Sequence, residues 1–208
     1  MRNRAGMFAC IAGLTLGFAV DAEAAEPRAV RSLLEMRREN VVMQEWDLSC
    51  GAAVITTVLN YQHGDMVTEK DVATTLMQRS EYVDNPLLVQ VRQGFSLLDL
   101  KRLVDSRGYQ GVGLGQMTFE HLLERAPVIV PIRTNGYNHF VVFRGQTAGR
   151  VLLADPAWGN RTMSRDDFEA AWIDYGDLGH VGFMVTKDGT PAPPAQLAAR
   201  PEDFWTFN

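Results

Sequence analysis

The segment Gln44–Gly51, QEWDLSCG, ends in a cysteine that stands at the start of a predicted helix. From Cys50 to Tyr61, small and apolar residues recur at spacings of four, three and four residues, as they do on one face of a helix. A thiol at the N-terminus of a helix lies near unpaired backbone N–H groups and the positive end of the helix dipole, which both favour the thiolate. Most free cysteines, however, are small buried hydrophobes. Cys50 is therefore a candidate nucleophile whose role depends on what the rest of the chain supplies.

Gln44 lies six residues before Cys50. At that distance its side-chain amide can point at an oxygen atom held beside the sulfur. Preorganised donors of this kind stabilise the oxyanion that forms during acyl transfer. We therefore expect Gln44 to contribute to an oxyanion hole.

The first 24 residues predict an export signal. Arg2 and Arg4 form a positive n-region, residues 5–20 an apolar stretch, and Ala22–Ala24 an A-x-A cleavage sequence. The apolar stretch is shorter than the roughly 20 residues that a membrane span needs, which disfavours a transmembrane anchor. We therefore expect a signal peptide at 1–24 and a periplasmic chain with no stable membrane anchor. Residues 25–187 are predicted to form one domain, followed by a Pro/Ala-rich tail at 188–208.

Removal of the signal peptide would leave one cysteine. Cys10 lies in the apolar stretch, so only Cys50 remains. In an oxidising compartment a single thiol is either bonded to another chain or reactive. The formal net charge of −5 is unchanged by the removal, because the signal holds equal numbers of acidic and basic residues. That charge argues against nucleic acid or an anionic membrane as the partner.

Helical patterns dominate the first half of the chain and strand patterns the second. Capping residues Thr68 and Ser96 predict two helices after the one at Cys50. The segment Ser80–Gln93 shows no clear period and is predicted to be a loop that borders a substrate groove. Helices followed by an antiparallel sheet predict an α+β domain. Further along, the patterns predict strands at 109–115, 128–134, 139–144, 151–155 and 181–187, and helices at 118–125 and 164–172.

Among the four histidines, His139 has the best placed partner. His139 begins a predicted strand and Asp155 ends the next one, so in a meander the two side chains meet at one rim of the sheet. An aspartate at that point can hold the imidazole in one tautomer and stabilise its cation. The alternative is that Asp155 only closes a turn before a proline. His63 follows the predicted helix in a turn and is expected to be a solvated loop residue, while His121 and His180 are expected to be structural.

The order of these segments resembles the C39 peptidases, papain-like cysteine proteases that process double-glycine leaders and bacteriocins. The resemblance runs from Gln44 to Val185. One departure is Ser49, where the family often has an acidic residue before the cysteine. The matching blocks are Gln44-x5-Cys50-Gly51-Ala52-Ala53, Asn138–Val142, Asp155–Gly159 and Ser164–Trp172.

The resemblance implies a papain-like fold, with a helical N-terminal half packed against a C-terminal antiparallel sheet. It also implies an endopeptidase that cuts after small residues, commonly Gly-Gly, without a metal or organic cofactor. In that reaction Cys50 is the nucleophile, His139 activates the thiol and protonates the leaving amine, and Asp155 orients His139. Gln44 and the backbone N–H of Cys50 form the oxyanion hole.

Most C39 domains are fused to an export ATPase, whereas this chain shows no nucleotide-binding motif and begins with its own signal. It is similar in this respect to the protease encoded with bacterial functional-amyloid export systems. The resemblance therefore implies a secreted polypeptide or leader as substrate and an outer-membrane export apparatus as a second partner. Two other functions stay open: a module that binds a peptide segment without cutting it, and a papain-like acyltransferase or transglutaminase.

Overall fold

The computed structural model describes residues 31–188 and 196–206, so the predicted signal peptide lies outside the described residues. Helices and strands follow each other in the α+β order that the sequence predicts. The helices are α1 (Leu33–Arg38), α2 (Cys50–His63), α3 (Glu69–Met77), α4 (Ser80–Asp84), α5 (Leu88–Val91), α6 (Leu97–Ser106), α7 (Phe119–Arg125), α8 (Arg165–Ala171) and α9 (Pro201–Thr206), with the 3-10 turn η1 (Gly176–Leu178). The strands are β1 (Gln110–Leu114), β2 (Val128–Thr134), β3 (Tyr137–Thr147), β4 (Arg150–Asp155), β5 (Gly159–Ser164) and β6 (Gly182–Thr186).

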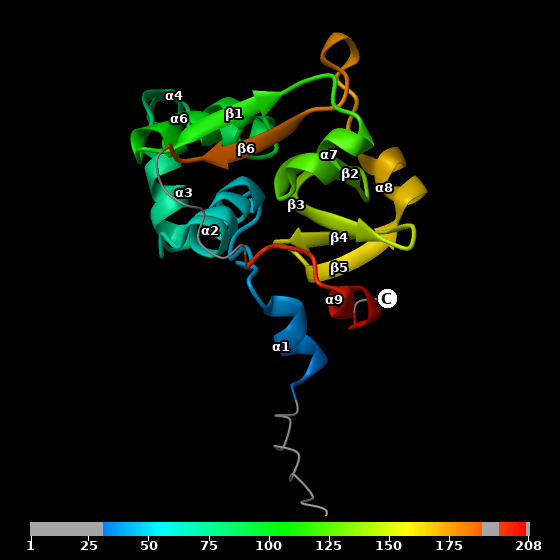
Figure 1. Ribbon diagram of the computed structural model, residues 1–208. Helices are drawn as coiled ribbons and strands as arrows, with labels where there is room; N and C mark the ends of the chain where they lie inside the picture. The colour runs from blue at the N-terminus through cyan, green and yellow to red at the C-terminus, as the bar shows by residue number, and fades with distance from the viewer. Residues whose placement is uncertain (1–30, 189–195, 207–208) are drawn as a thin grey trace, which may run out of the picture. The chain divides into compact units, whose positions relative to one another are not determined.

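The helices of the first half begin at the predicted caps. The Thr68 side chain accepts a hydrogen bond from the N–H of Asp71 at the start of α3, and Ser96 forms a capping box with Asp99 at the start of α6. In Figure 1, α2, α3, α4 and α6 gather on one side of the described residues, and strands β2 to β5 on the other. No helix in the described part of the chain combines the length and apolar character that crossing a membrane requires.

The six strands of the described residues form one antiparallel sheet in the order β1-β6-β2-β3-β4-β5. Strands β2, β3 and β4 are the predicted meander. The turn between β2 and β3 has positive φ angles at both central residues, 51° at Asn135 and 83° at Gly136, which suits a tight hairpin. The meander pairs Ile132 with His139 and Ala154 with Val142, so the start of β3 lies at the same rim as the end of β4.

Alternate residues of the central strands enter two different cores. On β2, Val128 and Val130 face a core that α7 and α8 cover, while Ile129 faces the core formed with α2, α3 and α6. This alternation is what a sheet buried on both faces requires. The sheet thus holds α2 on one face, which fixes the helix that begins at Cys50 against strand β3.

Two parts of the chain differ from the sequence-based expectation. Residues 80–93, predicted as a loop, contain the short helices α4 and α5, so that prediction is wrong. The two helices are only five and four residues long, too short to show a helical period, and Asn85 and Pro86 interrupt the segment. No strand is predicted at β5, whose residues GNRTMS do not alternate between apolar and polar.

The C-terminal segment, predicted as a tail, packs against the sheet where the structure describes it. Leu197 is fully buried, and the Nε atom of Arg144 on β3 donates to its carbonyl oxygen at 2.9 Å. Arg144 also forms a buried ion pair with Asp203 in α9 at 3.3 Å. A buried arginine needs such partners for its charge. These contacts fix the end of the described chain against the strand that carries His139.

Candidate active site

Cys50 is the first residue of α2 and the free, buried thiol of the described residues. The residue before it, Ser49, occupies the N-cap position, but its side chain forms no capping bond with the helix. The hydroxyl oxygen instead lies 2.8 Å from the carbonyl oxygen of Trp46 and 2.5 Å from Oε1 of Glu69, two acceptors that compete for its one proton. The N-terminus of a 14-residue helix therefore meets Cys50 without a side-chain cap, so unpaired backbone N–H groups lie where they can bind an oxyanion.

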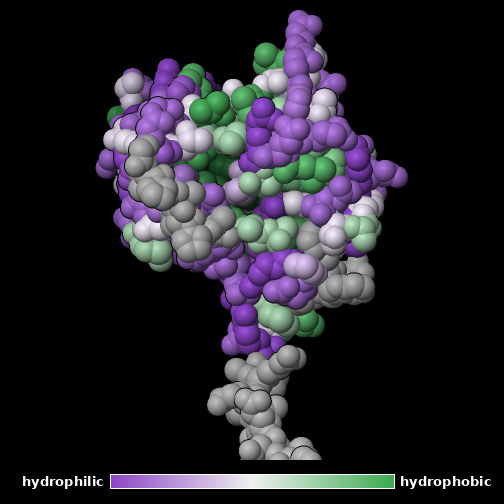
Figure 2. All heavy atoms as spheres, in the orientation of Figure 1, coloured by the Kyte–Doolittle hydropathy of each residue, from purple (hydrophilic) through white to green (hydrophobic). Residues whose placement is uncertain are grey.

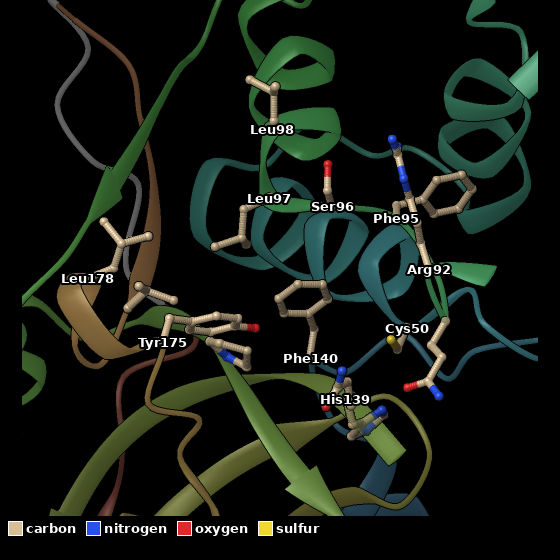
Figure 3. Close-up of a pocket in the computed structure, with 14 residues that line it drawn as sticks. Cys50, Arg92, Phe95, Ser96, Leu97, Leu98, His139, Phe140, Tyr175 and Leu178 are labelled. Atoms are coloured by element: carbon tan, nitrogen blue, oxygen red, sulfur yellow. The ribbon is translucent and has the colours of Figure 1, made fainter. Parts of the chain in front are cut away.

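His139 and Asp155 meet at the rim of the sheet, as the meander predicts. The distance from His139 Nε2 to Asp155 Oδ1 is 2.8 Å. Because Asp155 engages Nε2, the other ring nitrogen, Nδ1, is left to face the thiol. Cys50 and His139 line the same two cavities, and the thiol is among the groups that raise the pKa of His139. Figure 3 shows Cys50 and His139 next to each other.

Asp155 is fully buried and has three donors. Besides His139, the backbone N–H of Ala157 donates to Oδ1 at 2.9 Å, and Nε of Arg161 donates to Oδ2 at 2.8 Å. Both carboxylate oxygens are therefore occupied, which fixes the plane of the carboxylate and the direction of the bond to the imidazole. Arg161 belongs to β5, the strand that no sequence pattern predicts.

The protonation states of His139 and Asp155 follow from their hydrogen bonds and neighbouring charges. Burial disfavours the imidazolium, but the hydrogen bonds and negative charges of Asp155 and Cys50 outweigh it and raise the pKa of His139 to about 9. Burial also acts to raise the pKa of Asp155, yet the bond from His139 and the cationic charges of His139 and Arg161 hold that pKa below its ordinary value. At neutral pH the two side chains therefore form an imidazolium–carboxylate ion pair.

Gln44 reaches the same region from the segment before α2. Its backbone N–H donates to the carbonyl oxygen of Pro156 at 2.9 Å, which ties it to the turn after Asp155. Its Nε2 atom donates to the carbonyl oxygen of Trp46 at 3.2 Å, while Oε1 is buried without a hydrogen-bond partner among the described residues. Gln44, Cys50 and His139 line one cavity, so the amide is within reach of the predicted role.

Glu69 is a buried carboxylate near Cys50 that sequence reasoning missed. Its Oε1 atom accepts the Ser49 hydroxyl at 2.5 Å, and its Oε2 atom accepts the backbone N–H of Glu45 at 2.9 Å. One carboxylate thus holds both ends of residues 45–49. Burial is the main cause of a raised pKa at Glu69, and the two hydrogen bonds oppose it. No pattern in the sequence points to this contact.

Two cavities meet at Cys50 and His139. The first, here called the Leu97 cavity, has a volume of about 460 Å³ and is mostly apolar; Phe95, Leu97, Leu98, Phe140 and Leu178 line it. Figure 3 shows these side chains around the site, and Figure 2 shows hydrophobic side chains gathered in a hollow on one face. Arg92 and Gln93 also line it, so the end of the 80–93 segment borders the cavity as predicted.

The second, here called the Gln44 cavity, has a volume of about 590 Å³. Its lining is more polar in type, with Asp47, Asn135, Asn138 and Trp158 beside Gln44. An extended chain that passes over Cys50 can therefore contact an apolar surface on one side of the thiol and a polar, aromatic one on the other. Clefts with this mixture are typical of ligand sites.

The remaining three histidines have structural contacts, and His63, expected in a solvated turn, is instead the last residue of α2. None of them is among the residues that line the two cavities at Cys50. Their ring contacts are His63 Nε2 with the Val185 carbonyl oxygen at 3.0 Å, His121 Nδ1 with the Thr118 N–H at 3.2 Å, and the His180 ring stacked on Trp172 with centroids 4.5 Å apart.

Two relatives share the name "Probable functional amyloid protease FapD". The chain is 37% identical to the Pseudomonas fluorescens protein over 70% of its own length and 62% of that protein. It is 32% identical to the Pseudomonas aeruginosa (strain PAO1) protein over 89% of its own length and 80% of that protein. The chain thus spans less than two thirds of one relative and four fifths of the other.

Solved structures with the same fold include two peptidase domains of bacterial transporters. One is the crystal structure of a double glycine motif protease from an AMS/PCAT transporter in complex with its leader peptide, with a TM-score of 0.55 and 22% identity over 71% of this chain and 90% of that one. The other is the peptidase domain of Streptococcus ComA, with a TM-score of 0.56 and 15% identity over 73% of this chain and all of that one. The predicted papain-like α+β fold is thereby confirmed.

The sequence profile of the Peptidase C39 family matches residues 38–176, which include the cysteine helix, the meander and the turn after β4. This match covers well over half of the chain, and both curated relatives are more than 30% identical to it. The chain therefore belongs to the Peptidase C39 family.

Proposed function

We propose that this chain is a periplasmic cysteine endopeptidase that hydrolyses a peptide bond in a secreted polypeptide or its leader. The observation that carries the proposal is the placement of three groups in one site. The Cys50 thiol at the N-terminus of α2 adjoins an imidazole that is itself bonded to a buried carboxylate. This is the geometry that activates a nucleophile through a base and an orienting group.

In the first half of the reaction, the Cys50 sulfur attacks the carbonyl carbon of the substrate and the carbonyl π electrons move to oxygen. The backbone N–H of Cys50 and the Gln44 amide donate to that oxyanion, for which Gln44 Nε2 exchanges its bond to Trp46. The carbon–nitrogen bond then breaks, and the leaving amine takes the proton from the His139 imidazolium. The products of this half are a free amine and a thioester on Cys50.

In the second half, water attacks the thioester and the neutral imidazole of His139 accepts its proton. The carbon–sulfur bond breaks, which releases the new carboxyl end and restores the thiolate and imidazolium. Asp155 keeps its bond to His139 throughout and stabilises the cationic form of the ring. No other group is needed to balance the reaction.

The proposed substrate class rests on the shape of the site and on the relatives. The buried thiol favours small residues at the scissile bond, of the Gly-Gly kind, and the apolar Leu97 cavity favours an apolar side chain further along the substrate. The curated relatives are named as functional amyloid proteases, and one solved relative holds a leader peptide. A secreted amyloid subunit, or a leader that is removed during its export through the outer membrane, fits both.

Incubation of the purified chain with secreted proteins encoded beside it tests this proposal. We expect new N-termini after small residues, with each product pair gaining one ¹⁸O atom when the reaction is run in H₂¹⁸O. The matched control is Cys50→Ala, which should give no fragments. Binding of a polypeptide without cleavage would instead support the peptide-binding module, and product masses that lack the added water would support an acyltransferase.

A further inference from the structure

A small pocket lies beside the Gln44 cavity and has no part in the reaction described above. Its volume is about 290 Å³, and we call it the arginine pocket. It shares three lining residues with the Gln44 cavity, namely Thr134, Asn135 and Trp158, so the two lie side by side. A chain that extends from Cys50 across the Gln44 cavity therefore reaches it. The lining residues are Arg37, Thr134, Asn135, Trp158 and Arg161.

The charge on the lining of this pocket is positive. Two of its residues are arginines and none is acidic. Arg161 uses Nε to hold Asp155, which lies buried behind it. Arg37 has no ion pair with any carboxylate of the described residues. Asp47 lines the Gln44 cavity but not this pocket. A positive pocket next to the active site is unexpected in a chain with a net charge of −5.

The backbone of Arg37 is held in place, and its side chain is exposed. It belongs to α1, whose carbonyl oxygens at Met36 and Glu39 accept hydrogen bonds from Asn160 on β5 at 3.4 and 2.8 Å. Gly159, with φ at 79°, packs so closely that a Cβ atom there would lie 2.9 Å from the backbone carbon of Arg37. The backbone that carries Arg37 is thus held against the strand that carries Arg161, which keeps both residues at the same pocket.

We propose that the arginine pocket is a subsite for the carboxylate of an aspartate or glutamate side chain in the polypeptide substrate. The inference rests on the proposed function and deepens it by naming a second feature of the substrate. Guanidinium groups bind carboxylates through paired N–H donors. Thr134 and Asn135 add polar groups, and the exposed Trp158 offers an apolar face to the methylene stem of the acid.

A binding experiment tests the subsite without relying on cleavage. The Cys50→Ala chain is titrated with two peptides blocked at both ends, tri-glutamate and tri-glutamine, and binding is followed by NMR at the indole N–H of Trp158. The assignment of that signal comes from Trp158→Phe. We expect tri-glutamate to bind about fivefold more tightly at low salt, the scale of one exposed charge pair, and the difference to shrink as salt is added.

The matched variants are Arg37→Gln and Arg38→Gln. Both arginines lie in the last turn of α1 and both are exposed, but only Arg37 lines the pocket. The preference for tri-glutamate should disappear in Arg37→Gln and persist in Arg38→Gln. Equal binding of the two peptides, no saturable binding by either, or an equal loss in both variants would overturn the subsite.

A cleavage experiment separates this inference from the proposed function. A peptide library digested by the wild-type chain should show an enrichment of Asp or Glu at a fixed distance from the cut bond, and the Arg37→Gln digest should lack it. Cleavage without any acidic preference would overturn the subsite and leave the peptidase proposal intact. An absence of cleavage together with the expected difference in peptide binding would overturn the peptidase proposal and leave the subsite intact.

Discussion

Asp155 and Glu69 are two buried carboxylates near Cys50, one from the sheet and one from the helices, and their pKa values move in opposite directions. Asp155 is bonded to an imidazole and a guanidinium, and these cations hold its pKa below the ordinary value against the effect of burial. Glu69 is bonded to a hydroxyl and a backbone N–H, which are neutral, and burial raises its pKa.

The difference shows that the hydrogen-bond partners of a buried carboxylate decide its role. A carboxylate surrounded by cations acts through its charge, because the proton on its partner depends on that charge. A carboxylate surrounded by neutral donors acts through its position, because it satisfies those donors whether or not it is ionised. Asp155 should therefore govern the chemistry of His139, and Glu69 the shape of residues 45–49.

Cys50→Ser gives the background level of processing with which the variants of both carboxylates are compared. We expect processing to fall to background, because a serine hydroxyl cannot supply the thiolate nucleophile. The melting temperature should stay close to wild type, since the two side chains differ little in volume. Processing is measured by fragment mass spectrometry, and a level well above that of Cys50→Ala would remove Cys50 from its proposed role.

Asp155→Ala should give the next largest effect, a loss of about 10²-fold in turnover, which is the scale of a displaced acid–base group. Asp155→Asn should lose less, because the amide keeps a hydrogen bond to His139 but not the charge. Turnover of both variants is compared with thermal melts as the folding control. Equal turnover near wild type in both would reduce Asp155 to a residue that closes the turn.

The titration of His139 distinguishes charge from position directly. In the wild type its imidazole should titrate near pH 9, as the raised pKa requires, and turnover should fall above that pH because the leaving amine then lacks its proton donor. Asp155→Asn should move the midpoint downwards, since a neutral amide no longer stabilises the cation. Glu69→Gln should leave it in place. The midpoints are read from the carbon shifts of the labelled ring.

An equal shift of the His139 midpoint in Glu69→Gln would contradict the division between the two carboxylates. It would mean that the charge of Glu69 acts on His139 through the segment between them. The Asp155→Asn midpoint, measured under the same conditions, supplies the scale for that judgement.

Glu69→Ala should have a smaller effect on turnover but a measurable one on stability. We expect a loss of about 1–3 kcal/mol in the free energy of unfolding, because the Glu45 N–H loses its partner and the Ser49 hydroxyl keeps only the Trp46 carbonyl oxygen. Glu69→Gln should lose less, since an amide oxygen still accepts one of these bonds. Denaturant unfolding of both variants checks the order, and a larger loss in Gln than in Ala would contradict it.

The parts of the site that the sequence predicts lie in segments where apolar residues recur at the period of a strand or a helix. The alternation in β2 to β4 and the turn at Asn135 fix the register of the meander, and the register alone places His139 beside Asp155. Cys50 follows in the same way from the helical spacing after it. In each case a short repeating pattern carries the position of one side chain.

The parts that could not be predicted depend on contacts between segments without such a pattern. Glu69 lies in the first turn of α3, where an acid is common at any helix start, and nothing marks its bond to Ser49. Arg161 lies on β5, whose residues lack the apolar–polar alternation that would predict a strand. Residues 80–93 form helices too short to repeat. These features emerge only from tertiary packing, which overrides local propensity.

The hydrogen bond from the Gln44 N–H to the Pro156 carbonyl oxygen joins the strand end that carries Asp155 to the segment that leads to Cys50. Deuterium exchange at this one amide therefore reports how often the two halves of the domain separate. An opening that exposes it would displace the oxyanion donor and the imidazole's partner together. The exchange rate at the Gln44 amide thus measures the fraction of molecules in which Gln44, Cys50, His139 and Asp155 are held together. It can be measured before any substrate is known.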